Sequence, residues 1–185
     1  MAQQMTFEEK LEEGLQLLHE GDFDHSLDIA RELQKMEPDE ADGYRLEALV
    51  MQKLNQWDPS REVLDKAIEL EPNNSAFYNL RGFAHMQMDN LDQAREDFQE
   101  AIDLDDSPAA HRNLVLHHIM ADKVGEGINY LLERIREHPK DVENWIMMGD
   151  IMQRAGQNDK ARTYYQQAEK MDPENEYVKN QLSEI

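Results

Sequence analysis

A period of about 34 residues runs through the chain and constrains its fold more than any other feature. Helix-terminating residues stand at Pro38, Pro72, Asp106, Pro139 and Pro173, and the intervals between them are 34, 34, 33 and 34 residues. Each interval has the pattern of two short amphipathic helices joined by a turn. A sustained period of this length is typical of a solenoid, in which each unit buries its apolar stripe against its neighbours. We expect repeats at about 7–40, 41–74, 75–107, 108–141 and 142–175, then a capping helix at about 176–185.

Small residues recur at fixed places within this period. In the last repeat they are Gly149, Ala161 and Ala168, and their upstream counterparts are Gly82, Ala94 and Ala101, then Ala48, Ser60 and Ala67, then Gly14 and Ser26. Small side chains let two helices approach closely, so we interpret these positions as packing contacts. The fourth repeat departs, because Val115 and Arg134 replace the glycine and an alanine, and the interval before it is one residue short. We therefore predict an irregularity around repeat 4.

The composition excludes several classes of function. The 185 residues carry a formal charge of −21, from 40 acidic and 19 basic residues. Nucleic-acid binding depends on neutralising phosphates, and anionic membranes attract basic segments, so neither partner fits. No stretch approaches the roughly 18 apolar residues of a membrane span, and the N-terminal residues lack the pattern of a signal peptide. The chain also lacks cysteine. We expect a cytoplasmic protein with no membrane insertion.

The sequence offers no pattern of residues that indicates catalysis or a cofactor. It has no glycine-rich phosphate loop and no cysteine nucleophile, and its many carboxylates follow the polar faces of helices, which solvation explains. Three histidines could suggest a metal. However, His111 and His118 would lie about 10 Å apart along a helix, and the adjacent His117 and His118 diverge by about 100°. We expect no enzyme, no catalytic residue, no cofactor and no metal site.

The repeat resembles the tetratricopeptide (TPR) unit, a 34-residue helix-turn-helix. Its pattern has an aromatic residue and glycine in the first helix, then alanine, an aromatic residue, alanine and proline in the second. Repeat 5 matches with Trp145, Gly149, Ala161, Tyr165, Ala168 and Pro173, and repeat 3 matches with Tyr78, Gly82, Ala94, Phe98 and Ala101. The resemblance implies an all-α, right-handed superhelical solenoid of antiparallel helix pairs. It also implies that the first helices form a concave face that binds a peptide or helix of another protein.

On this resemblance, one position in each first helix should lie at the centre of the groove. There the middle repeats carry Arg45, Asn79 and Arg112, which can hydrogen-bond a peptide backbone or a carboxylate. The expected apolar lining consists of Leu49, Phe83, Met86, Leu116 and Ile119. The alternative is that the arginines only pair with neighbouring acids such as Asp42, because surface ion pairs are common and weak. The carboxylate clamp of some TPR proteins is not expected, since only Arg45 fits its pattern.

The leading hypothesis is a noncatalytic adaptor or assembly scaffold that binds a protein or peptide segment in this groove. One alternative is a structural scaffold that self-associates through the C-terminal helix or the acidic first repeat. Another is a dedicated chaperone for secreted or assembling subunits, as small acidic TPR proteins of similar appearance can be. Residues 1–40 hold 12 acids and 3 bases, which could attract a basic partner, although a solvated face explains this charge more simply.

Overall fold

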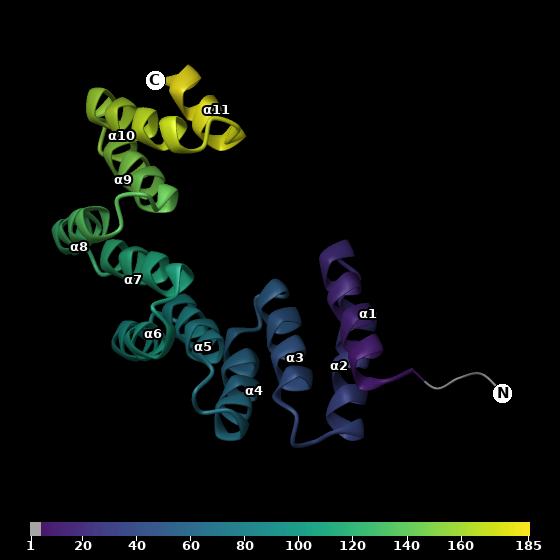
Figure 1. Ribbon diagram of the computed structural model, residues 1–185. Helices are drawn as coiled ribbons and strands as arrows, with labels where there is room; N and C mark the ends of the chain where they lie inside the picture. Colours follow the sequence, from purple (N-terminus) through teal and green to yellow (C-terminus); the bar gives the residue numbers. More distant parts are fainter. Residues whose placement is uncertain (1–4) are drawn as a thin grey trace. The chain divides into compact units, whose positions relative to one another are not determined.

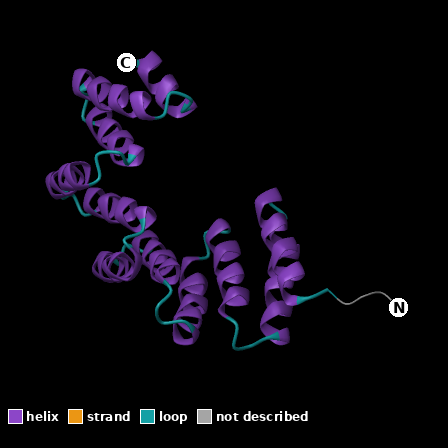
Figure 2. Ribbon diagram, in the orientation of Figure 1, coloured by secondary structure: helices purple, strands orange, loops and turns teal. Residues whose placement is uncertain are grey.

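The computed structural model describes residues 5–185, which form eleven α-helices and no strand (Figures 1 and 2). The helices are α1 (Phe7–Glu20), α2 (Phe23–Met36), α3 (Ala41–Lys53), α4 (Trp57–Leu70), α5 (Ser75–Gln87), α6 (Leu91–Asp105), α7 (Pro108–Met120), α8 (Val124–Glu137), α9 (Val142–Arg154), α10 (Asn158–Met171) and α11 (Glu176–Glu184). They alternate with short turns in the order that the period predicts. The all-α repeat array is therefore confirmed.

The chain divides into two compact units, Met1–Asn113 and Leu114–Ile185, and the boundary falls within α7. In the first unit, α1 packs on α2, α3 on α4, and α5 on α6, and each pair also contacts the next. In the second unit, α9 packs on α10, and α11 covers α10. The expectation of one continuous solenoid over residues 1–185 stays a prediction.

The small residues of the period lie where helices touch. A Cβ atom added to Gly82 would stand 2.8 Å from the ring of Phe98, and one added to Gly149 would stand 2.5 Å from the ring of Tyr165. Both distances are shorter than van der Waals contact, so each aromatic ring occupies the space that the missing side chain leaves. Ala94 and Ala161 are fully buried. The interpretation of these positions as packing contacts is confirmed.

Two hydrogen bonds recur with the period and fix the helices to each other. Where the first two repeats have serine in place of alanine, the Ser26 hydroxyl donates to the Gly14 carbonyl at 2.8 Å, and the Ser60 hydroxyl donates to the Ala48 carbonyl at 3.2 Å. The serine thus stays small and satisfies its own buried hydroxyl.

The second recurrent bond joins consecutive repeats. An aromatic side chain near the start of one repeat donates to the carbonyl of the proline that ends the previous repeat. The pairs are Tyr44 to Pro38 at 3.2 Å, Tyr78 to Pro72 at 3.0 Å and Trp145 to Pro139 at 3.0 Å. Tyrosine and tryptophan serve equally because each combines an apolar ring with one donor. This bond sets the angle at which the chain enters the next first helix.

In repeat 4 a larger residue in the first helix is accompanied by a smaller residue in the second. Val115 stands at the glycine position and is fully buried, and the facing position of α8 is Gly127 where other repeats have alanine or serine. A Cβ atom added to Gly127 would lie 3.8 Å from a methyl group of Val115. The small residue has therefore moved from the first helix to the second. Arg134, in the place of the second alanine, is 9% exposed.

Both ends of the described chain are capped. Thr6 and Glu9 form a capping box at α1, in which each side chain accepts from the backbone N–H of the other residue. At the other end, Val178 of α11 is fully buried, and Leu182 and Ile185 pack on the core that contains Tyr165. The apolar face of α11, which the self-association hypothesis uses, is therefore occupied within its own unit. None of the helices in the described part is long and apolar enough to span a bilayer.

Candidate partner-binding site

Arg45 of α3 is held by an acid on its own helix. Its Nε and a terminal nitrogen both lie 2.8 Å from Oδ1 of Asp42, and 29% of its side chain is exposed. This is the pairing that the alternative interpretation names. An exposed pair of this kind is weak, so a ligand carboxylate could still replace Asp42. Arg112 of α7 is exposed and also has an interaction within the molecule.

The other expected groove residues of unit 1 also have neighbours within the unit. Asn79 accepts a hydrogen bond from Asn113 at 2.9 Å, and the Phe83 ring stands edge-on to Trp57 with 5.8 Å between centroids. Leu49 is half-buried. Met86 differs from the expectation, because it is only 2% exposed. Its side chain lies in the core and is not available to a ligand in a groove.

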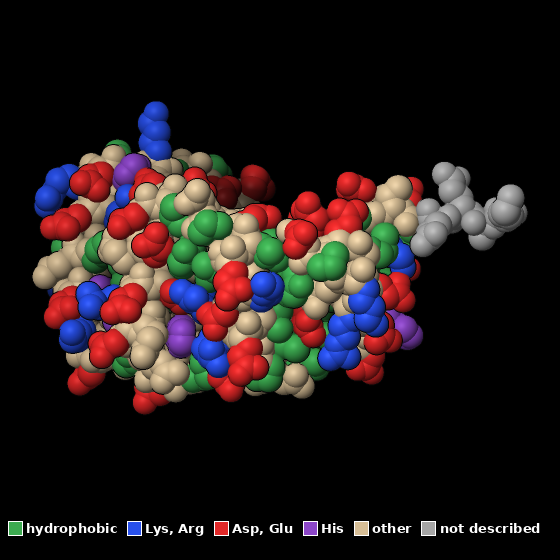
Figure 3. All heavy atoms as spheres, turned by 90° about the horizontal axis from the view of Figure 1, so that it is seen from below, with side chains coloured by type: hydrophobic (Ala, Val, Ile, Leu, Met, Phe, Trp, Pro, Cys, Tyr) green, Lys and Arg blue, Asp and Glu red, His purple; other side chains and the backbone are tan. Residues whose placement is uncertain are grey.

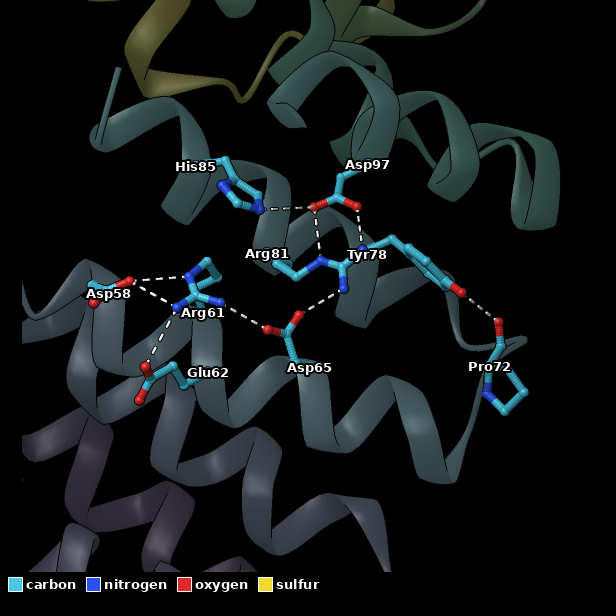
Figure 4. Close-up of polar contacts among 9 residues, drawn as sticks. All are labelled: Asp58, Arg61, Glu62, Asp65, Pro72, Tyr78, Arg81, His85 and Asp97. Atoms are coloured by element: carbon cyan, nitrogen blue, oxygen red, sulfur yellow. Dashed lines mark hydrogen bonds and ion pairs between the residues drawn. The ribbon is translucent and has the colours of Figure 1, made fainter. Parts of the chain in front are cut away.

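A polar network that the sequence reasoning missed joins α4, α5 and α6 in the same unit (Figure 4). Arg81 donates to both oxygens of Asp97 at 2.9 and 2.6 Å and to Asp65 at 2.8 Å, and Arg61 donates to the other oxygen of Asp65 at 2.9 Å. Hydrogen bonding to Asp97 raises the pKa of Arg81 further above its ordinary value. Because each carboxylate here accepts from a guanidinium, the network is a structural link between repeats 2 and 3.

His85 completes this network on its buried side. Its Nε2 atom lies 4.0 Å from Asp97, and its Nδ1 atom is buried without a hydrogen-bond partner among the described residues. Burial, as the largest cause, lowers the pKa of His85 below its ordinary value. Burial therefore favours the neutral imidazole over the charged form.

In unit 2, a hollow lies on the first helices α7 and α9. One part, of about 40 Å³, is lined by Leu116, Ile119, Met147, Asp150, Ile151 and Arg154. The adjoining part, of about 200 Å³, is lined by Ile119, Val124, Ile151, Arg154 and Ala155. We call these two parts together the α7–α9 hollow. An apolar floor with a few polar groups is the usual form of a binding pocket.

Two of the expected groove residues, Leu116 and Ile119, line the α7–α9 hollow. Its polar members Asp150 and Arg154 were not predicted. Asp150 stands at the repeat position that Leu49, Phe83 and Leu116 occupy in the preceding repeats, but in a strongly acidic chain it could not be told from the many solvated carboxylates. Met147 and Ile151 lie off the positions that the resemblance assigns to the groove.

Charge is unevenly divided between the units. The first unit holds 27 acidic and 10 basic residues, a net charge of −17, whereas the second holds 13 and 9, a net charge of −4. The face in Figure 3 shows acidic side chains interspersed with basic and hydrophobic ones. The α7–α9 hollow therefore belongs to the less charged unit.

The histidines of α7 do not form a ligand set in the described chain. His111 and His117 are 5% and 4% exposed, and His111 Nε2 lies 2.6 Å from Oδ1 of Asp106. His118 lies 3.5 Å from Glu126. Within residues 5–185, no three His, Asp or Glu side chains gather in a way that could hold a metal ion.

A family model of the tetratricopeptide repeat matches residues 75–108 and 142–175. Among solved structures, TTC0263, a thermophilic TPR protein of Thermus thermophilus, is 16% identical with a TM-score of 0.78, and the match covers 97% of this chain and 98% of that one.

Two further structures resemble the chain. PilW, described as a widely conserved type IV pilus biogenesis factor, is 15% identical with a TM-score of 0.74 over 98% of this chain and 88% of that one. YrrB, described as a TPR protein with an unusual peptide-binding site, is 12% identical with a TM-score of 0.60. The match covers 95% of this chain and 91% of that one. At these identities the likeness concerns the fold. No curated protein matches the sequence.

Proposed function

Because the chain is a tetratricopeptide repeat protein, we propose that it is a noncatalytic interaction module, an adaptor or assembly scaffold that holds a segment of a partner protein on its first helices. The observation that carries this proposal is the α7–α9 hollow. Leu116 and Ile119, two residues expected in the groove, line its apolar floor, which supports a partner contact on the first helices. YrrB, a solved structure of similar fold, is described as a TPR protein with an unusual peptide-binding site.

The central groove positions of repeats 2, 3 and 4 form a second contact surface, which we call the arginine ladder. Arg45, Asn79 and Arg112 would hold the backbone or carboxylates of the partner segment in unit 1. Leu49 and Phe83 are half-buried there and could contact apolar side chains of the segment. The double variant Arg45→Ala/Arg112→Ala tests this contribution, since unchanged affinity for the partner would remove the ladder from the site.

The decisive variant is Ile119→Arg, which places a long charged side chain where both parts of the hollow meet. Proteins that co-purify with the tagged full-length chain from its source would be quantified by mass spectrometry, and the affinity of each candidate would then be measured with purified proteins. We expect affinity to fall at least about tenfold. The partner can no longer bury an apolar side chain in the hollow, which costs about 1–2 kcal/mol or more of binding free energy.

The matched control is Leu132→Arg on α8. Leu132 is 39% exposed and lies outside the hollow, so this variant makes the same chemical change elsewhere in the unit. If the partner binds Ile119→Arg as well as it binds the wild-type chain, the hollow is not its site.

Self-association and chaperone activity remain alternatives with separate tests. Removing residues 176–185 would uncover the core under Val178, so oligomeric state is better measured by light scattering on the full chain over a range of concentrations. A constant monomer mass would exclude self-association in that range. A chaperone would suppress aggregation of its co-purified partner at stoichiometric amounts.

A further inference from the structure

Two opposite charges line the α7–α9 hollow without pairing with each other. Asp150 and Arg154 are one turn apart on α9, and both line its smaller part. Carboxylate and guanidinium groups at this spacing commonly form an ion pair. Within residues 5–185, however, no ion pair of either residue is found. Something else fixes the carboxylate.

Two tyrosines from the next helices hold Asp150. Tyr165 of α10 and Tyr177 of α11 donate to the same oxygen, Oδ1, at 2.6 and 2.8 Å. Burial and the bond to Asp150 raise the pKa of Tyr177 to about 12, so its hydroxyl remains a donor at neutral pH. The other oxygen, Oδ2, accepts no hydrogen bond from the described residues. Asp150, which lines the hollow, therefore keeps one carboxylate oxygen for a ligand on a side chain that is already fixed and loses little entropy on binding.

Arg154 supplies the complementary donor. It is exposed, and it lines both parts of the hollow, next to the apolar surface of Ile119, Val124 and Ala155. A basic ligand group at this place would be attracted by Asp150 but repelled by Arg154. An acidic group would be attracted by Arg154 but repelled by Asp150. A neutral group with one donor and one acceptor satisfies both charges. The peptide group is such a group.

We propose that the α7–α9 hollow binds an extended segment of the partner, with one peptide N–H donated to Asp150 Oδ2, one carbonyl accepting from Arg154, and an aliphatic side chain in the part near Val124. This inference rests on the proposed function and decides between two forms of partner. In the interior of an α-helix the backbone N–H and C=O groups are already paired, so a helical segment could offer neither. The occupant is therefore an extended chain.

The test is a titration of the full-length protein, labelled at its isoleucine and methionine methyl groups, followed by NMR. The probe is the peptide acetyl-Ala-Ala-Leu-Ala-Ala-amide. Three comparison peptides are used: one methylated at the leucine nitrogen, one methylated at the nitrogen of the next alanine, and one hydrocarbon-stapled helix with the same leucine. We expect the parent peptide to shift the methyl signals of Ile119, Ile151 and Met147 at millimolar concentration.

Methylation of the leucine nitrogen should weaken binding by about tenfold, because it removes a hydrogen bond to a charged acceptor. Methylation of the next nitrogen should have a smaller effect. In Asp150→Asn the difference between the two methylated peptides should disappear, since the amide can still accept from the tyrosines but presents NH₂ in place of the open oxygen. Glu133→Gln on α8 removes the same charge outside the hollow and should leave the difference unchanged.

The outcomes separate this inference from the proposed function. If neither methylation weakens binding, or if the stapled helix binds as tightly as the parent, the extended occupant is excluded while the hollow remains a binding site. If no peptide shifts the signals of Ile119 and Ile151, the hollow is not a peptide site, and the proposed function loses the observation that carries it.

Discussion

Repeats 3 and 5 match the same family model, yet they stabilise the same packing with different chemistry. In both, a glycine of the first helix lies against an aromatic ring of the second: Gly82 against Phe98, and Gly149 against Tyr165. The hydroxyl that distinguishes the two rings bonds to Asp150, and repeat 3 has Phe83 at the position of Asp150. The repeat with the tyrosine ring thus has an aspartate that accepts from its hydroxyl, and the repeat with the phenylalanine ring has no such acceptor at that position.

A second set of positions differs more strongly. Where repeat 3 has the network residues Arg81, His85 and Asp97, repeat 5 has Met148, Met152 and Tyr164. Met148 is fully buried and Met152 is 7% exposed, so these places are apolar in one repeat and ionic in the other. These two repeats share the glycine and the aromatic ring, whereas their neighbouring buried positions carry either ionic or apolar residues.

The largest expected loss of stability comes from removing one partner of the ionic network in repeat 3. Asp97→Ala leaves Arg81 without its bidentate partner in a site where Asp97 is 8% exposed. We expect the free energy of unfolding to fall by about 3 kcal/mol, the lower end for a broken buried pair, because Asp65 still accepts from Arg81. Urea denaturation followed by circular dichroism measures the change, and hydrogen exchange in α5 locates it.

The control converts the whole set to the residues of repeat 5. Arg81→Met/His85→Met/Asp97→Tyr removes the charges together, and replacing a buried ionic group by apolar residues is often neutral or stabilising. The triple variant should therefore stay within about 1 kcal/mol of the wild type. A triple variant as unstable as Asp97→Ala would show that the two repeats are not interchangeable at these positions.

The second prediction concerns the glycines. An alanine Cβ at position 149 would meet three ring atoms of Tyr165 at 2.5, 2.6 and 2.9 Å, and the hydroxyl bonds of Tyr165 to Asp150 and Gln153 prevent the ring from moving away. Gly149→Ala should destabilise by about 2 kcal/mol, within the range for overpacking.

Gly82→Ala should cost less, because the Phe98 ring has no hydroxyl to anchor it and its nearest atom would be 2.8 Å away. Adding Tyr165→Phe to Gly149→Ala should recover part of the loss. Thermal denaturation of the three variants checks this order. Equal losses at both glycines would show that the hydroxyl bonds do not restrain the ring.

The smallest effect is a dependence of stability on pH that comes from His85 in repeat 3, whereas repeat 5 contains no histidine. The pKa of His85 is lowered in the folded state, so between that value and the unfolded value of about 6.5 the unfolded chain binds more protons. Stability is therefore fully present above about pH 6.5 and decreases as the pH falls, until the folded pKa is passed.

His85→Met, which introduces the residue of repeat 5, should flatten the change in unfolding free energy between about pH 7.5 and about 5.5, above the range where most carboxylates titrate. His25, whose pKa is raised by its bond to Asp22, changes stability in the opposite sense but is present in both proteins and cancels in the difference. Identical pH profiles would show that the burial of His85 has no such cost.

Most of the fold could be predicted from the sequence, because the packing positions recur at fixed intervals. Gly82, Gly149 and their alanines are identified by spacing alone, and each lies at a helix contact. Repeat 4 is predicted to be irregular from Val115, Arg134 and the short interval before it. Gly127 stands at the alanine position of the same period, but only the contact between the two helices shows that it compensates for Val115. A substitution and its compensation on another helix share no local pattern.

The candidate site was predictable only in part. Leu116 and Ile119 follow from their positions in the first helix and line the hollow. Met86 follows from the same reasoning and is buried, because it lies one helical turn after Gly82, on the face that packs against Phe98. Asp150 could not be distinguished, since its role depends on hydroxyls that lie 15 and 27 residues away in sequence.

The two tryptophans give each unit its own intrinsic fluorescence probe. Trp57 stands against Phe83 in the first unit, and Trp145 donates its indole N–H to Pro139 in the second. The chain contains no third tryptophan. Its tryptophan emission is therefore the sum of one indole signal from each unit. Trp57→Phe and Trp145→Phe would each leave a single tryptophan, so tryptophan fluorescence could show whether the two units unfold in one step or in sequence.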